Sequence, residues 1–227
     1  MTSLTAAAVL QPWIAQQYAE LASAMTDFSD PENVHIARVR CRRLRSVLGG
    51  WRSILPPHAP KMRSRLQHLG RQISHLRDID VIADLISLDP PSDLPDWRQR
   101  IAQQRTPLLD EATLVAHSAN TRALLRDVRE LAVSDWGLAG HQPAADIAGA
   151  VLDAEKARLA EVKATATDPH EVRKAAKRLR YNAEVAAVVL PEATEVAVAA
   201  EAIQERLGAD LDHQMVAAWL SEARASG

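Results

Sequence analysis

The sequence predicts an all-helical protein. Aromatic residues make up only 4% of its 227 residues, alanine and leucine are abundant, and valine and isoleucine rarely alternate with polar residues as they do in strands. Apolar side chains form 47% of the chain and charged ones 25%, so a sizeable core can be buried and disorder is not expected. We therefore expect packed helices throughout.

Helix boundaries are marked by proline, glycine and capping residues. Asp30-Pro31 and Asp168-Pro169 each place a capping carboxylate before a proline at the first helical position. Breaks are expected at Pro56-Pro57, in the proline-rich run 89–95 and in the run Gly137–Gly140, which resembles a hinge. The helices are expected at about 4–27, 31–54, 59–88, 94–116, 119–133, 143–166, 169–190 and 192–225.

The chain contains an internal repeat. At a constant offset of 135 residues, His35-x-x-Arg38-x-x-x-Arg42-Arg43-Leu44-Arg45 aligns with His170-x-x-Arg173-x-x-x-Lys177-Arg178-Leu179-Arg180. The match weakens downstream, where Arg77-Asp78 corresponds to Leu211-Asp212. This duplication predicts two pseudo-symmetric antiparallel helical bundles, the first at about 1–134 and the second at about 141–227, within a single domain over 1–227.

Positive charge is concentrated in one region of the chain. The net charge is −2, from 27 Lys and Arg residues and 29 Asp and Glu residues. Between Asn33 and Arg77 there are eleven Lys and Arg residues and no acidic residue. The negative charge that balances this basic region must therefore come from the acidic remainder of the fold or from a ligand.

The repeated residues share one face of each helix. At about 100° per residue, side chains three and four positions apart return to the same side. The two stripes are His35, Arg38, Arg42 and Arg45, and His170, Arg173, Lys177, Arg180 and Tyr181, with Lys174 at the edge of the second. Like charges so placed repel by a few tenths of a kcal/mol per pair. Arginine forks, lysine charges and histidine donors suit phosphate oxygens, so a chain of phosphates fits these stripes.

The duplicated motif, together with the later run Leu76-Arg77-Asp78-Ile79-Asp80-Val81, resembles the CHAD (conserved histidine α-helical domain) family over nearly the whole chain. The resemblance implies one CHAD domain whose helical bundles surround a central basic groove or pore that binds inorganic polyphosphate. It also implies a place of action at polyphosphate granules, for a stand-alone member of the family. The chain departs from the family pattern at Ser74, where glycine is common, and at Leu211, where an arginine would complete the second Arg-Asp pair.

Carried over residue by residue, the resemblance implies a set of polyphosphate-binding residues. They are His35, Arg38, Arg42, Arg43, Arg45, Lys61, Arg65, His170, Arg173, Lys174, Lys177, Arg178, Arg180 and Tyr181. Arg43 and Arg178 are expected at the flanks of the stripes. Lys61, Arg65 and His68 are expected on a neighbouring helix that lies alongside the first stripe.

Several of these residues also have simpler interpretations. An arginine-rich helix is commonly a solvated surface, and a histidine in a first helical turn, such as His170, can be a cap. Arg77, Asp78 and Asp80 are expected to form packing pairs between helices. Cys41 lies on the apolar side of its helix and is expected in the core. The five scattered tryptophans are expected to pack in the core, not to stack on bases.

Two other functions remain open. A polybasic helix face can also bind nucleic acid by releasing counterions, although the net charge of −2 and the low aromatic content disfavour that partner. A metal-dependent phosphohydrolase is the second alternative, but no His-Glu-x-x-His or cysteine-rich metal motif is present. We therefore expect a binding protein without enzymatic activity, catalytic residues, metal or cofactor. The sequence does not predict the oligomeric state.

Three features bear on location. Cys41 is the single cysteine, which fits a reducing compartment. The first eight residues lack a basic and apolar signal pattern, and no run approaches about 18 uncharged apolar residues. We expect a cytoplasmic protein that does not enter the membrane.

Overall fold

The computed structural model describes residues 4–225, apart from the side chains of residues 209 and 210. Within this range the chain forms ten helices, and its single β-type pairing is an isolated bridge between Thr5 and Pro143. The helices are α1 Ala6–Ala24, α2 Pro31–Gly50, α3 Ala59–Gln72, α4 Ser74–Leu88, α5 Trp97–Ala116, α6 Ala119–Leu131, α7 Gly137–Gly140, α8 Ala144–Thr165, α9 Pro169–Ala186 and α10 Ala193–Ala225. The all-helical prediction is confirmed.

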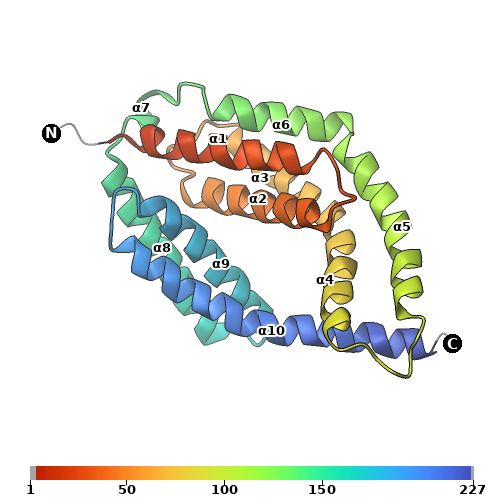
Figure 1. Ribbon diagram of the computed structural model, residues 1–227. Coiled ribbons are helices and arrows are strands. Elements are labelled where there is room, and N and C mark those ends of the chain that lie inside the picture. The colour runs from red at the N-terminus through yellow and green to blue at the C-terminus, as the bar shows by residue number, and fades with distance from the viewer. Residues whose placement is uncertain (1–3, 226–227) are drawn as a thin grey trace.

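The helices form two packed groups that meet at the repeated segments. Helices α1, α2, α3 and α6 pack together in one group, and α8, α9 and α10 in the other (Figure 1). Helix α2 contacts α9, so the two copies of the sequence repeat lie against each other. Helices α4 and α5 stand on the opposite side of the molecule from α8, and the C-terminal part of α10 runs past their ends (Figure 1).

Both predicted Asp-Pro helix starts are confirmed. The side chain of Asp30 accepts a hydrogen bond of 2.9 Å from the backbone N–H of Glu32, at the start of α2. The side chain of Asp168 accepts one of 2.8 Å from the N–H of His170, at the start of α9. Each contact satisfies a backbone donor that the first helical turn leaves free.

The expectation of one helix over 59–88 is wrong, because the chain turns at Ile73. This residue has φ −94° and ψ 7° and is fully buried, so the turn places an apolar side chain in the core and redirects α4 away from α3. The hydroxyl of Ser74 donates to the carbonyl of Arg71 at 2.7 Å and caps the end of α3. A second difference is that the expected break at Gly137–Gly140 contains the one-turn helix α7, entered through Gly137 at φ +62°.

The contact between α2 and α9 is close because glycine occupies the end of α2. A Cβ atom on Gly50 would lie 2.3 Å from the Oδ1 atom of Asn182 on α9. Asn182 is fully buried, and its Nδ2 atom donates to the carbonyl of Arg178 at 2.8 Å. The side chain of Asn182 therefore has little room to move, and only glycine fits at position 50.

The last turns of α10 are attached to α5. The indole N–H of Trp219 donates to Oε1 of Gln104 at 2.8 Å, and Arg100 donates to the carbonyl of Ala223 at 3.1 Å. Arg224 pairs with Asp93, just before α5, at 2.7 Å. The C-terminal helix is thus linked to α9 and also to α4 and α5.

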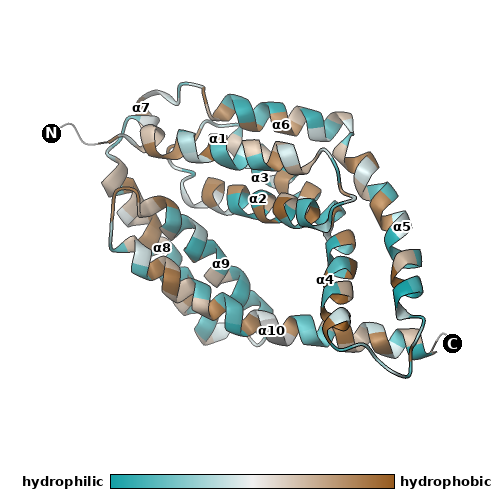
Figure 2. Ribbon diagram, in the orientation of Figure 1, coloured by the Kyte–Doolittle hydropathy of each residue, from teal (hydrophilic) through white to brown (hydrophobic). Residues whose placement is uncertain are grey.

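None of the helices within residues 4–225 combines the length and the apolar character needed to cross a membrane. Hydrophilic and hydrophobic residues are interspersed along each of the long helices (Figure 2).

A glycine-to-alanine pair tests the close packing of α2 on α9. Gly50→Ala should lower the free energy of unfolding by roughly 1–3 kcal/mol, since the new methyl group overlaps a held side chain. Gly149→Ala, inside α8, is the matched control: nothing lies within 4 Å of the added Cβ. It should raise stability by roughly 0.5–1 kcal/mol through helix propensity. Urea unfolding of the two variants measures both values, and equal stabilisation would show that the contact at Gly50 is not tight.

Candidate functional site

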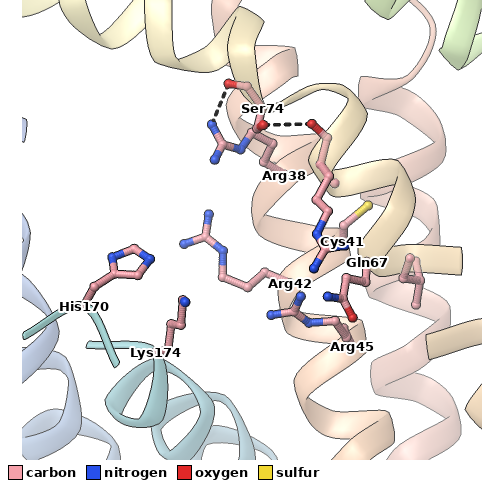
Figure 3. Close-up of a pocket in the computed structure, with 11 residues that line it drawn as sticks. Arg38, Cys41, Arg42, Arg45, Gln67, Ser74, His170 and Lys174 are labelled. Carbon is pink, nitrogen blue, oxygen red and sulfur yellow. Dashed lines mark hydrogen bonds between the residues drawn. The ribbon is translucent and has the colours of Figure 1, made fainter. Parts of the chain in front are cut away.

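A pocket opens between α2, α3, the start of α4 and α9. Its volume is about 300 Å³. Figure 3 shows Arg42 and Arg45 of α2 facing His170 and Lys174 of α9 across the same space. The lining residues are Arg38, Cys41, Arg42, Arg45, Leu66, Gln67, Gly70, Arg71, Ser74, His170 and Lys174. Most of the polar ones are cationic, which makes this a site for an anion.

Deeper cations from both copies of the repeat adjoin the pocket. Burial lowers the pKa of Arg42; the Tyr181 side chain opposes this, and the charges of Arg38 and Arg173 lower the pKa further. Burial also lowers the pKa of Lys177 to about 7, with further lowering by Arg42, Arg173 and Arg38 and an opposing effect from Asp212. Cations of α2 and α9 are thus close enough to disfavour each other's charge.

The two repeated histidines border this cationic region. Burial is the main factor that lowers the pKa of His35, and Arg77 lowers it further. Burial likewise lowers the pKa of His170, with an additional effect from Lys174. Both rings are therefore largely neutral at pH 7 and gain charge when an anion approaches.

Many of the predicted cations already have carboxylate partners. Arg38 donates to Oδ1 of Asp78 at 2.9 Å and to the carbonyl of Ser74 at 3.0 Å. The other pairs are Arg43 with Glu184, Arg178 with Glu155 at 2.6 Å, Arg180 with Glu184 and with Glu201 at 2.8 Å each, Lys174 with Glu171 at 2.7 Å, and Arg65 with Asp127. These side chains are held by the fold itself.

Four cations of the two stripes differ in this respect, and we call them the open cations: Arg42, Arg45, Arg173 and Lys177. Among the side chains that the structure describes, no carboxylate lies within 4.0 Å of any of them. Arg173 is positioned by a long contact of 3.4 Å from its Nε to the carbonyl of Gln204. A Cβ atom at Gly208 would lie 2.9 Å from a terminal nitrogen of Arg173, so a side chain at position 208 would displace that guanidinium group.

Three residues expected beside the first stripe lie elsewhere. Helix α3 does pack against α2, but Lys61 and His68 are exposed outside the pocket. Arg65 points toward α6, where it contacts Asp127 and donates to the carbonyl of Asn120 at 3.1 Å. Gln67, Gly70, Arg71 and Ser74 line the pocket in their place. Gln67, Gly70 and Arg71 are three and four residues apart, which identifies the face of α3 that meets α2, whereas Ser74 follows the turn at Ile73 and belongs to α4.

Arg43, Arg180 and Tyr181 support the pocket from behind. The carboxylate of Glu184 contacts both arginines, and the guanidinium of Arg43 lies 5.1 Å from the centre of the Tyr181 ring. Tyr181 is only 4% exposed, so its ring packs in the core. These three residues hold α2 on α9 and leave the pocket surface to their neighbours.

The packing pairs between helices expected for the Arg-Asp segment are found for Asp78 and Asp80, whereas Arg77 contacts a residue of its own helix α4. Asp80 is buried and accepts a hydrogen bond of 2.7 Å from Arg105 of α5, while Asp78 pairs with Arg38 of α2. Arg77 lies 3.9 Å from Asp84. Cys41 is also buried, as expected, and burial raises the pKa of its thiol to about 12. The described residues contain no group of three or more His, Cys, Asp and Glu side chains that could hold a metal ion.

Sequence reasoning missed Arg71 and Ser74. Both belong to the acid-free stretch. Arg71 lies on α3 before the turn at Ile73, and Ser74 lies after it, at the start of α4, where its carbonyl accepts a hydrogen bond of 3.0 Å from Arg38. The expected continuous helix over 59–88 concealed this turn. Arg71 could have been found by asking which residues of α3 lie three and four positions from Gln67.

The chain belongs to the CHAD family, because the CHAD domain model matches residues 8–221. A similar solved structure is the crystal structure of the CHAD domain from the plant Ricinus communis. It is 22% identical, with a TM-score of 0.73, and the alignment covers 99% of this chain and 81% of that one. No curated protein matches the sequence. The shared fold agrees with the family resemblance of the repeated motif.

The low pKa of Lys177 predicts how the free energy of unfolding depends on pH. An unfolded lysine has a pKa of about 10.4, so between about pH 7 and pH 10 the unfolded state binds more protons and stability rises with pH. Lys177→Met should therefore stabilise the protein by at least about 1 kcal/mol at pH 7, with a gain that shrinks toward pH 10. Urea unfolding at several pH values measures the gain.

Lys174→Met is the control for this experiment, because Lys174 lies one turn away on the same helix but is exposed. Its effect should stay within about 0.5 kcal/mol at every pH. A gain from Lys177→Met that does not change with pH would contradict the assignment of a depressed pKa.

Proposed function

We propose that this protein binds inorganic polyphosphate in the pocket between α2 and α9. The observation that carries the proposal is the convergence of the four open cations from both copies of the repeat. Holding like charges together lowers stability, and a bound polyanion would offset that cost. The membership in the CHAD family, whose resemblance implies polyphosphate binding, supports the same ligand.

The side chains suit a chain of phosphates better than a single small anion. Arg42 and Arg45 come from successive turns of one face of α2, so their guanidinium groups can contact neighbouring phosphates. Arg173 and Lys177 lie across from them on α9. Each further phosphate engages a cation while the earlier contacts hold the chain nearby, so affinity should grow with chain length.

We further propose a binding role without catalysis, in the cytoplasm and at polyphosphate granules. The pocket gathers arginine, lysine and histidine side chains, which repel the divalent cations used for phosphate hydrolysis. The single buried Cys41 fits a reducing compartment. Release of orthophosphate from polyphosphate in the presence of Mg²⁺ would argue for the phosphohydrolase alternative.

Nucleic acid is the less suitable polyanion. Glu195 and Glu205 are exposed on α10, which packs against α9, so the surface around α9 also carries acidic side chains. The cations are recessed in a pocket and do not form a broad surface. A thin, flexible phosphate chain can enter that pocket, whereas a duplex meets the acidic surroundings.

A double variant tests the assigned residues. Arg42→Gln with Arg173→Gln should weaken binding to long-chain polyphosphate on the order of 100-fold, since each removed charge-assisted hydrogen bond contributes about 1.5–3 kcal/mol. Arg38 is less suitable for substitution because Asp78 already partly neutralises it. Isothermal titration calorimetry gives the dissociation constants, and circular dichroism checks that the fold is retained.

Arg126→Gln with Arg129→Gln is the control, because both residues are exposed on α6 and the charge change is the same. Its affinity should stay within about twofold of the parent protein. Competition with duplex DNA at matched phosphate concentration belongs to the same experiment. Affinity retained in the folded Arg42 and Arg173 variant, or equal preference for DNA, would refute the proposal.

Binding should also take up a proton. A polyanion beside Lys177 favours its charged form and raises its pKa from about 7, so at pH 8 complex formation should bind up to one proton. Affinity should accordingly rise as the pH falls from 9 to about 7. Calorimetry of long-chain polyphosphate in Tris and in HEPES, which differ in ionisation enthalpy, measures the uptake. Lys177→Met should abolish it, and an unchanged uptake in that variant would exclude Lys177 as the group concerned.

A further inference from the structure

A second group of cations surrounds the C-terminal end of α2. It consists of Arg52, Arg63 and Arg158, and we call it the distal arginine cluster. Arg52 follows the end of α2, Arg63 lies on α3 and Arg158 lies on α8. The three residues are exposed, and they are not part of the duplicated motif. Helices from both halves of the chain thus contribute to one basic surface.

Two close contacts place Arg63 on α2 and the side of α8 that carries Arg158 against α9. A Cβ atom on Gly49 would lie 3.0 Å from Nε of Arg63, so the guanidinium of Arg63 rests on the last turn of α2. Arg178 of α9 pairs with the buried Glu155 of α8 at 2.6 Å. Arg158 comes three residues after Glu155 and therefore lies on the same side of α8.

The electrostatics agree with this placement. Burial is the main factor that lowers the pKa of Arg63, followed by the charges of Arg178, Arg158 and Arg52, whereas Glu155 opposes the shift. Arg178, Arg158 and Arg52 are therefore all near enough to Arg63 to act on it.

Arg45 connects this cluster with the pocket. Burial lowers the pKa of Arg45 most, and Arg63, Arg42, Arg71 and Arg178 lower it further. Arg45 therefore lies within reach of pocket cations on one side and of Arg63 on the other. Cations thus follow one another from Arg42 and Arg45 in the pocket lining to Arg63, which rests on Gly49 at the end of α2.

The charge of this surface is not balanced by the protein. Among the described side chains, no carboxylate lies within 4.0 Å of Arg45, Arg52, Arg63 or Arg158. Glu155 is already paired with Arg178. The free carbonyls at the C-terminus of α2 supply a partial charge of only about −0.5. An anion from solution is therefore needed to compensate the remaining cations.

The other end of the pocket is different. Asp78 is there beside Arg38, and Asp212 lies close enough to Lys177 to raise its pKa. Arg77 at this end has Asp84 at 3.9 Å. Carboxylates repel a phosphate chain, so the route past Arg45 is the electrostatically favourable one.

We propose that a long polyphosphate chain occupies the pocket with one segment and leaves it past Arg45, so that the following phosphates lie on the distal arginine cluster. This inference rests on the proposed function and adds a second binding segment to it. A short chain fills the pocket alone, whereas a long chain engages both segments at once. The cluster therefore acts as a sensor of chain length, because its contacts form only when the chain extends beyond the pocket.

The test compares two ligands on one variant. Arg63→Gln with Arg158→Gln should leave the dissociation constant for tripolyphosphate within about twofold of the parent protein, and should weaken binding of chains of about 60 phosphates by about tenfold or more. Both residues are exposed, so the fold should be retained, which urea unfolding checks. The double variant of Arg126 and Arg129 on α6 is the control for the change in net charge.

The outcomes separate the two proposals. If the parent protein binds neither ligand, the proposed function fails. If it binds both and the distal variant loses affinity for long chains only, the second segment is supported. An equal loss for short and long chains, no loss for either, or the same loss in the α6 control overturns the distal segment and leaves polyphosphate binding in the pocket standing.

Discussion

The close crossing of α2 on α9 is the constraint on which the rest of this molecule depends. Gly50 lets the backbone of α2 approach Asn182, and Glu184 contacts arginines on both helices. Because one side of each helix is fixed in this way, the stripes that carry Arg42 and Lys177 must face each other. The crossing therefore converts two separate basic helix faces into one site.

Carboxylates are distributed unevenly over the arginines of this crossing. Those that hold helices together, such as Arg43 and Arg178, receive a glutamate each. Of those that line the pocket, Arg38 pairs with Asp78, whereas Arg42 and Arg45 have no carboxylate partner among the described side chains. Like charges held together without carboxylates lower the stability of the fold at the pocket, and the paired arginines elsewhere offset this loss. Binding sites commonly show such a distribution. The negative net charge and the basic pocket are thus compatible.

The fold was largely predictable because its signals are local. Asp30-Pro31 and Asp168-Pro169 begin α2 and α9, and composition excluded sheets. The turn at Ile73 was missed because no proline or glycine marks it; the gain from burying this side chain decides it, and burial depends on the whole fold. The one-turn helix α7 was also missed, because the run Gly137–Gly140 was expected to be an irregular break.

The sequence by itself determined the helical class, the repeat and the two stripes, since helix periodicity fixes which side chains share a face. It also contained the pairing of Arg180 with Glu184, which are four residues apart. Only the tertiary structure decided which cations of the stripes remain without a carboxylate partner. Arg178 meets Glu155, 23 residues away, and Arg65 meets Asp127, 62 residues away. Such pairs depend on how helices cross, and helix crossing is set by packing over the whole chain, which no local pattern records.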